Sequence, residues 1–113
     1  MNLTLRMEQI ELSNNSIFGV VPVSCKDRTY IANYGMDLYH LGITYNLMVS
    51  SNTEYYNTKE KKASTKHFLW ALYFLKNYPS TDNMVAIFDT NDKTLRKWIW
   101  IVIDMIKNID NVS

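Results

Sequence analysis

The chain has 113 residues, 47% hydrophobic and 13% aromatic, so it can form one domain with a substantial core and is not a disordered tail. Its 12 basic and 11 acidic residues give a net charge of +1, so only a local basic surface can attract an anionic partner. The single Cys25 cannot form an internal disulfide, nothing at the N-terminus resembles a secretion signal, and no apolar window approaches the roughly 20 residues of a membrane span. We therefore expect an intracellular protein without a membrane segment.

The first 33 residues give no clear secondary-structure pattern. Residues 1–12 match the helical and the strand repeat equally well. Residues 13–16 (SNNS) have the composition of a loop, and 17–23 (IFGVVPV) form an apolar run that glycine and proline interrupt. We predict an N-terminal extension of uncertain structure over 1–33, with an irregular segment at 17–23 lying over a helical core.

Two helices are predicted next. The first begins at Ser24 or Asp27 and ends at Gly35, which can adopt the positive φ of a helix C-terminus. Residues 38–48 form the second, capped by Asp37, and the glycine within it allows a neighbouring helix to approach closely.

The polar stretch 50–62 follows these two helices. Its only large apolar side chains are Tyr55 and Tyr56, and it carries the basic cluster 59–62. This composition predicts an exposed loop or charged linker, which would add at most nonspecific attraction for phosphates.

The C-terminal half predicts three helices. Residues 64–78 have apolar side chains at three- and four-residue spacing and stop at Pro79. Residues 81–89 form a short amphipathic helix capped by Thr81 or Asp82, and a longer helix follows a cap at Asp92. The apolar stripe of this last helix comprises Leu95, Trp98, Ile99, Val102, Ile103, Met105, Ile106 and Ile109. Three helices sharing one core over 64–109 are typical of a helix-turn-helix.

The last helix begins with a basic segment. Cations at this end oppose helix formation slightly, and an external anion such as a phosphate would offset them. We expect Arg96 to contact a base edge and Lys97 a phosphate; the alternative is a solvated basic helix end. The predicted DNA-contacting residues are Lys66, Lys93, Thr94, Arg96 and Lys97.

Three blocks of sequence between residues 34 and 110 carry a family resemblance. They are Tyr34-Gly35, the segment 67–79 (HFLWALYFLKNYP) and the segment 92–100 (DKTLRKWIW). Together they resemble the N-terminal region of PIF/Harbinger-type transposases, which precedes the DDE endonuclease domain. The last block is the specific one, because Lys-Thr, Arg-Lys and Trp recur in that order at the end of the family's helix-turn-helix.

The resemblance implies DNA binding through a homeodomain-like unit of three helices. The catalytic acids of these transposases lie downstream in a ribonuclease H-like domain, before which this chain ends, so we expect no catalytic residue and no enzymatic activity. The resemblance leaves 1–33 unmatched. The chain is therefore expected to be either a transposon-derived DNA-binding protein or a fragment of a longer transposase.

These observations predict an all-α fold of about five helices, with a helical DNA-binding domain at 34–113. The expected partner is double-stranded DNA in the nucleus. The competing hypothesis is an accessory subunit of a larger nuclear complex, for example with a DNA-modifying enzyme, docking through Trp100 and Ile101 on the apolar last helix. Trp100 lies off the apolar stripe and has three interpretations: stacking on a base, binding a partner, or packing on the first pair of helices, which we expect.

The remaining chemical groups have simple structural interpretations. His40, His67 and Cys25 match no metal-ligand spacing, so we expect no metal, no cofactor and no small-molecule substrate. We expect Cys25 to be a free structural thiol. Four acids lie where helix caps and turns are expected: Asp37, Asp82, Asp89 and Asp92.

Overall fold

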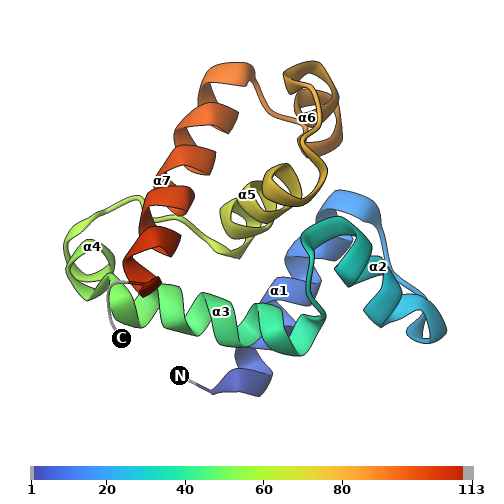
Figure 1. Ribbon diagram of the computed structural model, residues 1–113, viewed down its shortest axis with the longest axis horizontal. Coiled ribbons are helices and arrows are strands. Elements are labelled where there is room, and N and C mark those ends of the chain that lie inside the picture. The colour runs from blue at the N-terminus through green and yellow to red at the C-terminus, as the bar shows by residue number, and fades with distance from the viewer. Residues whose placement is uncertain (1, 111–113) are drawn as a thin grey trace.

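The part of the chain that the structure describes, residues 2–110, is all-α in this computed structural model (Figure 1). Its elements are α1 (Leu3–Phe18), a short 3-10 helix η1 (Val23–Cys25), α2 (Lys26–Tyr34), α3 (Leu38–Ser51), α4 (Thr53–Thr58), α5 (Thr65–Asn77), α6 (Thr81–Phe88) and α7 (Asp92–Asp110). The predicted all-α class is confirmed. The predicted count of five is wrong, because α1 and α4 bring the α-helices of the described part to seven. None of the helices in this part is both long and apolar enough to cross a membrane.

Helix α1 occupies much of the segment that the sequence left unassigned. The Asn2 side chain caps it by accepting hydrogen bonds from backbone N–H groups of the first turn, the shorter at 2.8 Å. The helix continues through 13–16 and ends before Gly19, which has a φ of 87°. The predicted loop at 13–16 is therefore wrong, and the predicted irregular segment at 17–23 is wrong at its start, which is helical through Phe18.

The buried side of α1 combines the apolar residues Met7, Ile10 and Ile17 with two polar side chains, Arg6 and Asn14. Arg6, only 6% exposed, lies with its guanidinium 4.2 Å from the centre of the Tyr45 ring and donates to Asn46 Oδ1 at 3.0 Å. Asn14 is fully buried and accepts a 2.6 Å hydrogen bond from the hydroxyl of Tyr34. These contacts place two polar side chains among the apolar ones on the side of α1 that packs against α3 and α5, although Asn14 Nδ2 has no hydrogen-bond partner within residues 2–110.

The turn between α2 and α3 forms as the sequence predicts. Gly35 ends α2 in the left-handed conformation with a φ of 85°, and Asp37 caps α3 by accepting the His40 backbone N–H at 2.9 Å. A Cβ at Gly42 would lie 2.9 Å from Leu3 Cδ1 and 3.1 Å from Met7 Cγ. This confirms that the glycine permits close approach of another helix, which is α1.

Helix α4 and the end of α3 lie inside the stretch 50–62 predicted as an exposed loop, so that prediction is wrong for residues 50–51 and 53–58. The two tyrosines of α4 hold the chain that follows. The Tyr55 hydroxyl accepts the Ala63 N–H at 3.0 Å, and the Tyr56 hydroxyl donates to the Ala63 carbonyl at 3.3 Å. Ala63 is buried as a result, and the start of α5 is fixed in place.

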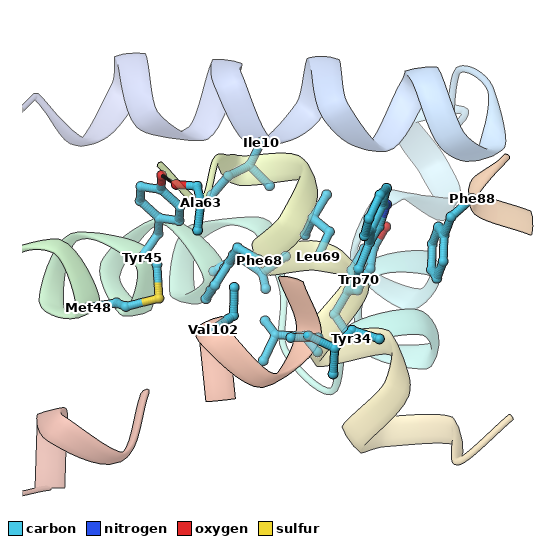
Figure 2. Close-up of a cluster of buried hydrophobic side chains, with 14 of the residues drawn as sticks. Ile10, Tyr34, Tyr45, Met48, Ala63, Phe68, Leu69, Trp70, Phe88 and Val102 are labelled. Carbon is cyan, nitrogen blue, oxygen red and sulfur yellow. Dashed lines mark hydrogen bonds between the residues drawn. The ribbon is translucent and has the colours of Figure 1, made fainter. Parts of the chain in front are cut away.

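Helix α5 lies at the centre of the core (Figures 1 and 2). Five consecutive residues of this helix, Phe68 to Leu72, are buried, and α5 packs against α1, α2 and α7. Helix α7 packs against α3 and α6 as well as α5. Figure 2 shows Val102 of α7 beside Phe68 in the middle of the cluster. Tyr45 and Met48 of α3 lie next to them on one side, and Trp70 and Phe88 lie on the other.

Replacing Gly42 with valine should destabilise the fold, because the added carbons overlap α1 side chains. We expect the free energy of unfolding to fall by about 2 kcal/mol, measured by urea denaturation. The matched control is Ser50→Val on the exposed side of the same helix, where only a few tenths of a kcal/mol of helix propensity should be lost. Equal losses for the two variants would show that the contact of α1 with α3 is not close.

Candidate nucleic-acid interface

The start of α7 follows a three-residue turn that closes α6. Ser80 caps α6 by accepting the Asn83 backbone N–H at 3.2 Å, so the predicted caps Thr81 and Asp82 are wrong by one and two residues. Asp89 ends this helix in the left-handed conformation, with a φ of 51°. Aspartate tolerates this conformation better than most residues, because its short side chain can bond locally. The chain reverses over 89–91, and α7 begins at Asp92.

Asn91 caps α7, so the predicted cap at Asp92 is also wrong. The Asn91 side-chain oxygen accepts the Thr94 backbone N–H at 2.8 Å, and its carbonyl accepts the Leu95 N–H at 3.0 Å. Asp92 is the first helical residue. Thr94 is half-buried at the side of this first turn, less exposed than the cations around it.

Asp92 instead pairs with Arg96 one turn later. Its Oδ1 lies 2.7 Å from Arg96 Nε, and the side chains are 53% and 65% exposed, respectively. The pair is therefore a surface contact, of small energy, and not an occluded network. Because the pair engages Nε, the two terminal amino groups of the guanidinium take no part in this contact.

The buried side of α7 determines what its other side presents. Leu95, Ile99, Val102 and Met105 are at most 5% exposed and face the core. At about 100° per residue, Lys93, Arg96, Lys97 and Trp100 fall on the opposite side within an arc of about 100°. All four are exposed, and we call them the outward face of α7.

Lys66 comes from a different helix but lies close to this face. Its ammonium is 5.5 Å from the centre of the Trp70 ring, and that of Lys97 is 5.0 Å from the centre of the Trp98 ring. His67 joins the two, since its ring stacks on Trp98 with centres 4.0 Å apart and meets the edge of Trp70 at 5.0 Å. Both predicted contacts, Lys66 and Lys97, therefore lie near the His67 ring, whose pKa their charges lower.

The pKa of His67 is affected by the positive charges near its ring. Burial, the larger cause, and the nearby ammonium groups of Lys66 and Lys97 together lower its pKa to about 4. Its Nδ1 accepts the Ser64 backbone N–H at 3.1 Å, which requires the neutral ring. Sequence reasoning missed this role, although a polar side chain three residues after a capping serine was a usable signal.

Trp100 and Ile101, the predicted partner-binding residues, differ in exposure. Ile101 is partly buried against the core, whereas Trp100 is 56% exposed. Trp100 does not pack on the first pair of helices as predicted. It borders a groove of about 230 Å³ that the end of α5, the start of α6 and α7 line together, with Phe74, Pro79 and Thr81 among its walls. Arg96 borders the same groove, so the start of α6 lies next to the outward face of α7.

The remaining hollow, the basic cluster and the cysteine show fewer features of a binding site. A larger, open hollow of about 580 Å³ is lined by polar residues of α4 and by Asn108, with Glu54 and Lys59 of opposite charge. The predicted basic cluster 59–62 is exposed. Cys25 is half-buried and free, and it accepts a weak hydrogen bond from Arg28 at 3.6 Å. Within residues 2–110, the structure places no three potential metal ligands together.

Comparisons of this chain with protein-family models, with curated proteins and with solved structures give no match. The resemblance to the N-terminal region of PIF/Harbinger-type transposases therefore stays a prediction.

Replacing Asn91 with alanine should cost about 1 kcal/mol of unfolding free energy, because a first-turn N–H of α7 loses its acceptor. Asp92→Ala should cost about 0.4 kcal/mol, the usual value of an exposed ion pair one helical turn apart. Chemical denaturation of both variants tests which of them loses more unfolding free energy. A larger loss for Asp92→Ala than for Asn91→Ala would show that Asp92, and not Asn91, caps α7.

The protein should become less stable below neutral pH because of His67. An unfolded histidine binds a proton below its ordinary pKa of 6.5, whereas the folded ring does so only near pH 4. The unfolded state thus binds more protons between these values, and stability is lost as pH falls from 6.5 towards 4. Because part of the ring is exposed and screened by solvent, we expect the free energy of unfolding to fall by about 1 kcal/mol between pH 7 and pH 5. The unfolding midpoint should fall by about 5 °C.

The matching control is His67→Gln, which keeps an acceptor at this position but does not titrate. Its unfolding midpoint should change little between the two pH values, while His40→Gln should keep the loss. A His67→Gln protein with the same pH dependence as the unmodified chain would show that another group is responsible.

Proposed function

We propose that this protein is a non-catalytic DNA-binding protein or subunit that acts in the nucleus and contacts duplex DNA with the outward face of α7. In this proposal α5, α6 and α7 form a homeodomain-like helix-turn-helix, with α7 as the recognition helix. The single observation that carries it is the division of α7 into a buried apolar side and an exposed basic side. The transposase resemblance of the segment 92–100 supports the same interpretation.

The dimensions of the outward face suit a major groove. From Lys93 to Trp100 the helix rises by about 10 Å, at about 1.5 Å per residue. The major groove of B-form DNA is about 12 Å wide and admits a helix. The next exposed residue on this side is Asp104, whose charge would repel phosphates. The favourable contact with DNA therefore extends over the first turns of α7 and ends near Trp100.

The proposal gives each basic residue a role. Arg96 points its free amino groups to a guanine edge while Asp92 holds Nε, since an arginine fork matches the two acceptors of guanine. Lys93, Lys97 and Lys66 contact phosphates as point charges. Thr94, at the side of the first turn, contacts the backbone of the duplex. The start of α6 lies beside the groove next to Arg96, where its N-terminal N–H groups can meet a phosphate.

A second candidate is favoured by the exposed indole of Trp100. An accessory subunit of a nuclear complex would bury this side chain, together with the edge of Ile101, against another polypeptide. The variant Trp100→Ala distinguishes the two candidates. If it no longer forms a stable complex that the unmodified protein forms in the native source, while its duplex binding is unchanged, the subunit is favoured.

The double variant Arg96→Ala with Lys97→Ala tests the DNA-binding proposal. Losing a base contact and a phosphate contact should weaken duplex binding about 10- to 100-fold at low salt and make the salt dependence shallower by about one unit of log–log slope. Fluorescence anisotropy with a labelled duplex at two salt concentrations measures both.

Lys107→Ala is the control for charge, since it removes a cation from the same helix beyond Asp104. It should leave the affinity almost unchanged. If the unmodified protein has no duplex affinity at low salt, or if Lys107→Ala weakens binding as much as the double variant, the proposal is wrong.

A further inference from the structure

The indole of Trp100 is an unusual group for a surface helix. It is 56% exposed, whereas Trp70 is 3% exposed and Trp98 is covered on one face by His67. Because so much of this large apolar side chain is in contact with water, most of the stabilising free energy of its burial is not gained. A partner that covers this indole would recover that free energy.

The neighbours of Trp100 are apolar along one edge of the ring and basic towards the start of α7. That edge borders the apolar groove with Phe74, Pro79 and Ile99. Arg96, one turn earlier, borders the same groove, and Lys97 follows it on the outward face of α7. The charges that surround the exposed part of the ring are therefore positive on the side towards the start of α7, and a polyanion is the complementary partner.

The spacing from Arg96 to Trp100 along α7 determines how many base pairs separate their contacts on duplex DNA. Four residues correspond to a rise of about 6 Å, which is close to two base-pair steps of about 3.4 Å. When Arg96 contacts a guanine, Trp100 lies about two base pairs further along the groove. The major-groove edge there is polar except for one group, the C5-methyl of thymine.

We infer that Trp100 contacts a thymine methyl group about two base pairs from the guanine that Arg96 contacts. This inference rests on the proposed DNA-binding function and extends it to a sequence preference. The indole and the methyl group exclude water from each other, so Trp100 favours an A·T pair in one orientation over the other. Asp104, one turn beyond, limits the contact to this one base pair.

The experiment begins with a random-sequence duplex pool from which the unmodified full chain enriches its preferred sequence. Each thymine of the enriched duplex is then replaced in turn by deoxyuridine, which lacks only the methyl group. One replacement, about two base pairs from a guanine, should weaken binding about fourfold, the value expected for one buried methyl group. The same replacement should not weaken binding by Trp100→Ala.

Tyr39→Ala is the matched control, because Tyr39 is an aromatic residue of similar exposure on α3. This variant should respond to deoxyuridine as the unmodified chain does. The deoxyuridine series on the unmodified chain alone is decisive even if Trp100→Ala does not fold, a condition that its thermal unfolding reveals.

The outcomes separate this inference from the proposed function. If no deoxyuridine weakens binding by the unmodified chain, or if Trp100→Ala shows the same loss, the thymine contact is wrong while duplex binding stands on the Arg96 and Lys97 variants. If single-stranded DNA binds more tightly than the duplex, the contact is also wrong, because the indole then stacks on an unpaired base. If the pool yields no bound duplex at low salt, both proposals fail.

Discussion

The packing of α7 on α5 is the interaction on which the rest of the structure depends. Leu95, Ile99 and Val102 bury one side of α7 in the core that Phe68 and its neighbours on α5 build. Each of these side chains contributes about 1.5–3 kcal/mol by leaving water. A rotation of α7 about its axis would expose them together, so the helix has one orientation. The direction of its basic residues follows from that orientation.

Two further contacts fix α7 at both ends. Asn91 closes its first turn, and at the other end the side-chain amide of Asn52, between α3 and α4, donates to the Met105 carbonyl at 3.0 Å. The first turns nevertheless place Lys93, Arg96 and Lys97 where the helix dipole disfavours cations. Only Asp92 offsets them locally, through its pair with Arg96. The fold thus tolerates a small electrostatic cost at the start of α7, which an anion bound there would reduce.

Much of the fold was predictable wherever a helix buries an apolar stripe. The helices α2, α3, α5, α6 and α7 were predicted within a few residues, because spacing, glycine and proline mark them. Helix α1 was not, since its buried positions include Arg6 and Asn14, which a hydrophobicity pattern assigns to the surface. The Arg6 guanidinium and the Asn14 side-chain oxygen have partners in Tyr45, Asn46 and Tyr34, which are distant in sequence. Tertiary contacts of this kind leave no local signal.

The candidate site was predictable in its charges and not in its geometry. The basic residues of α7 follow from the sequence, but Asn91, and not Asp92, caps the helix, because the chain enters one residue earlier than expected. The proximity of Lys66 to Lys97 depends on the stacking of His67 on Trp98 from a different helix. The exposure of Trp100 likewise follows from the orientation of α7, whereas the sequence led us to expect packing on the first pair of helices.

The most direct test of the account is to map the duplex on the protein by the backbone amide shifts of the ¹⁵N-labelled full chain in NMR spectra. The account predicts that adding a short duplex at low salt shifts the amides of 93–100 most, followed by Lys66 and His67, and leaves α1 and α2 nearly unchanged. Largest shifts on α1, α2 or α3, or no shifts at saturating duplex, would contradict the claim that the outward face of α7 is the surface that meets DNA.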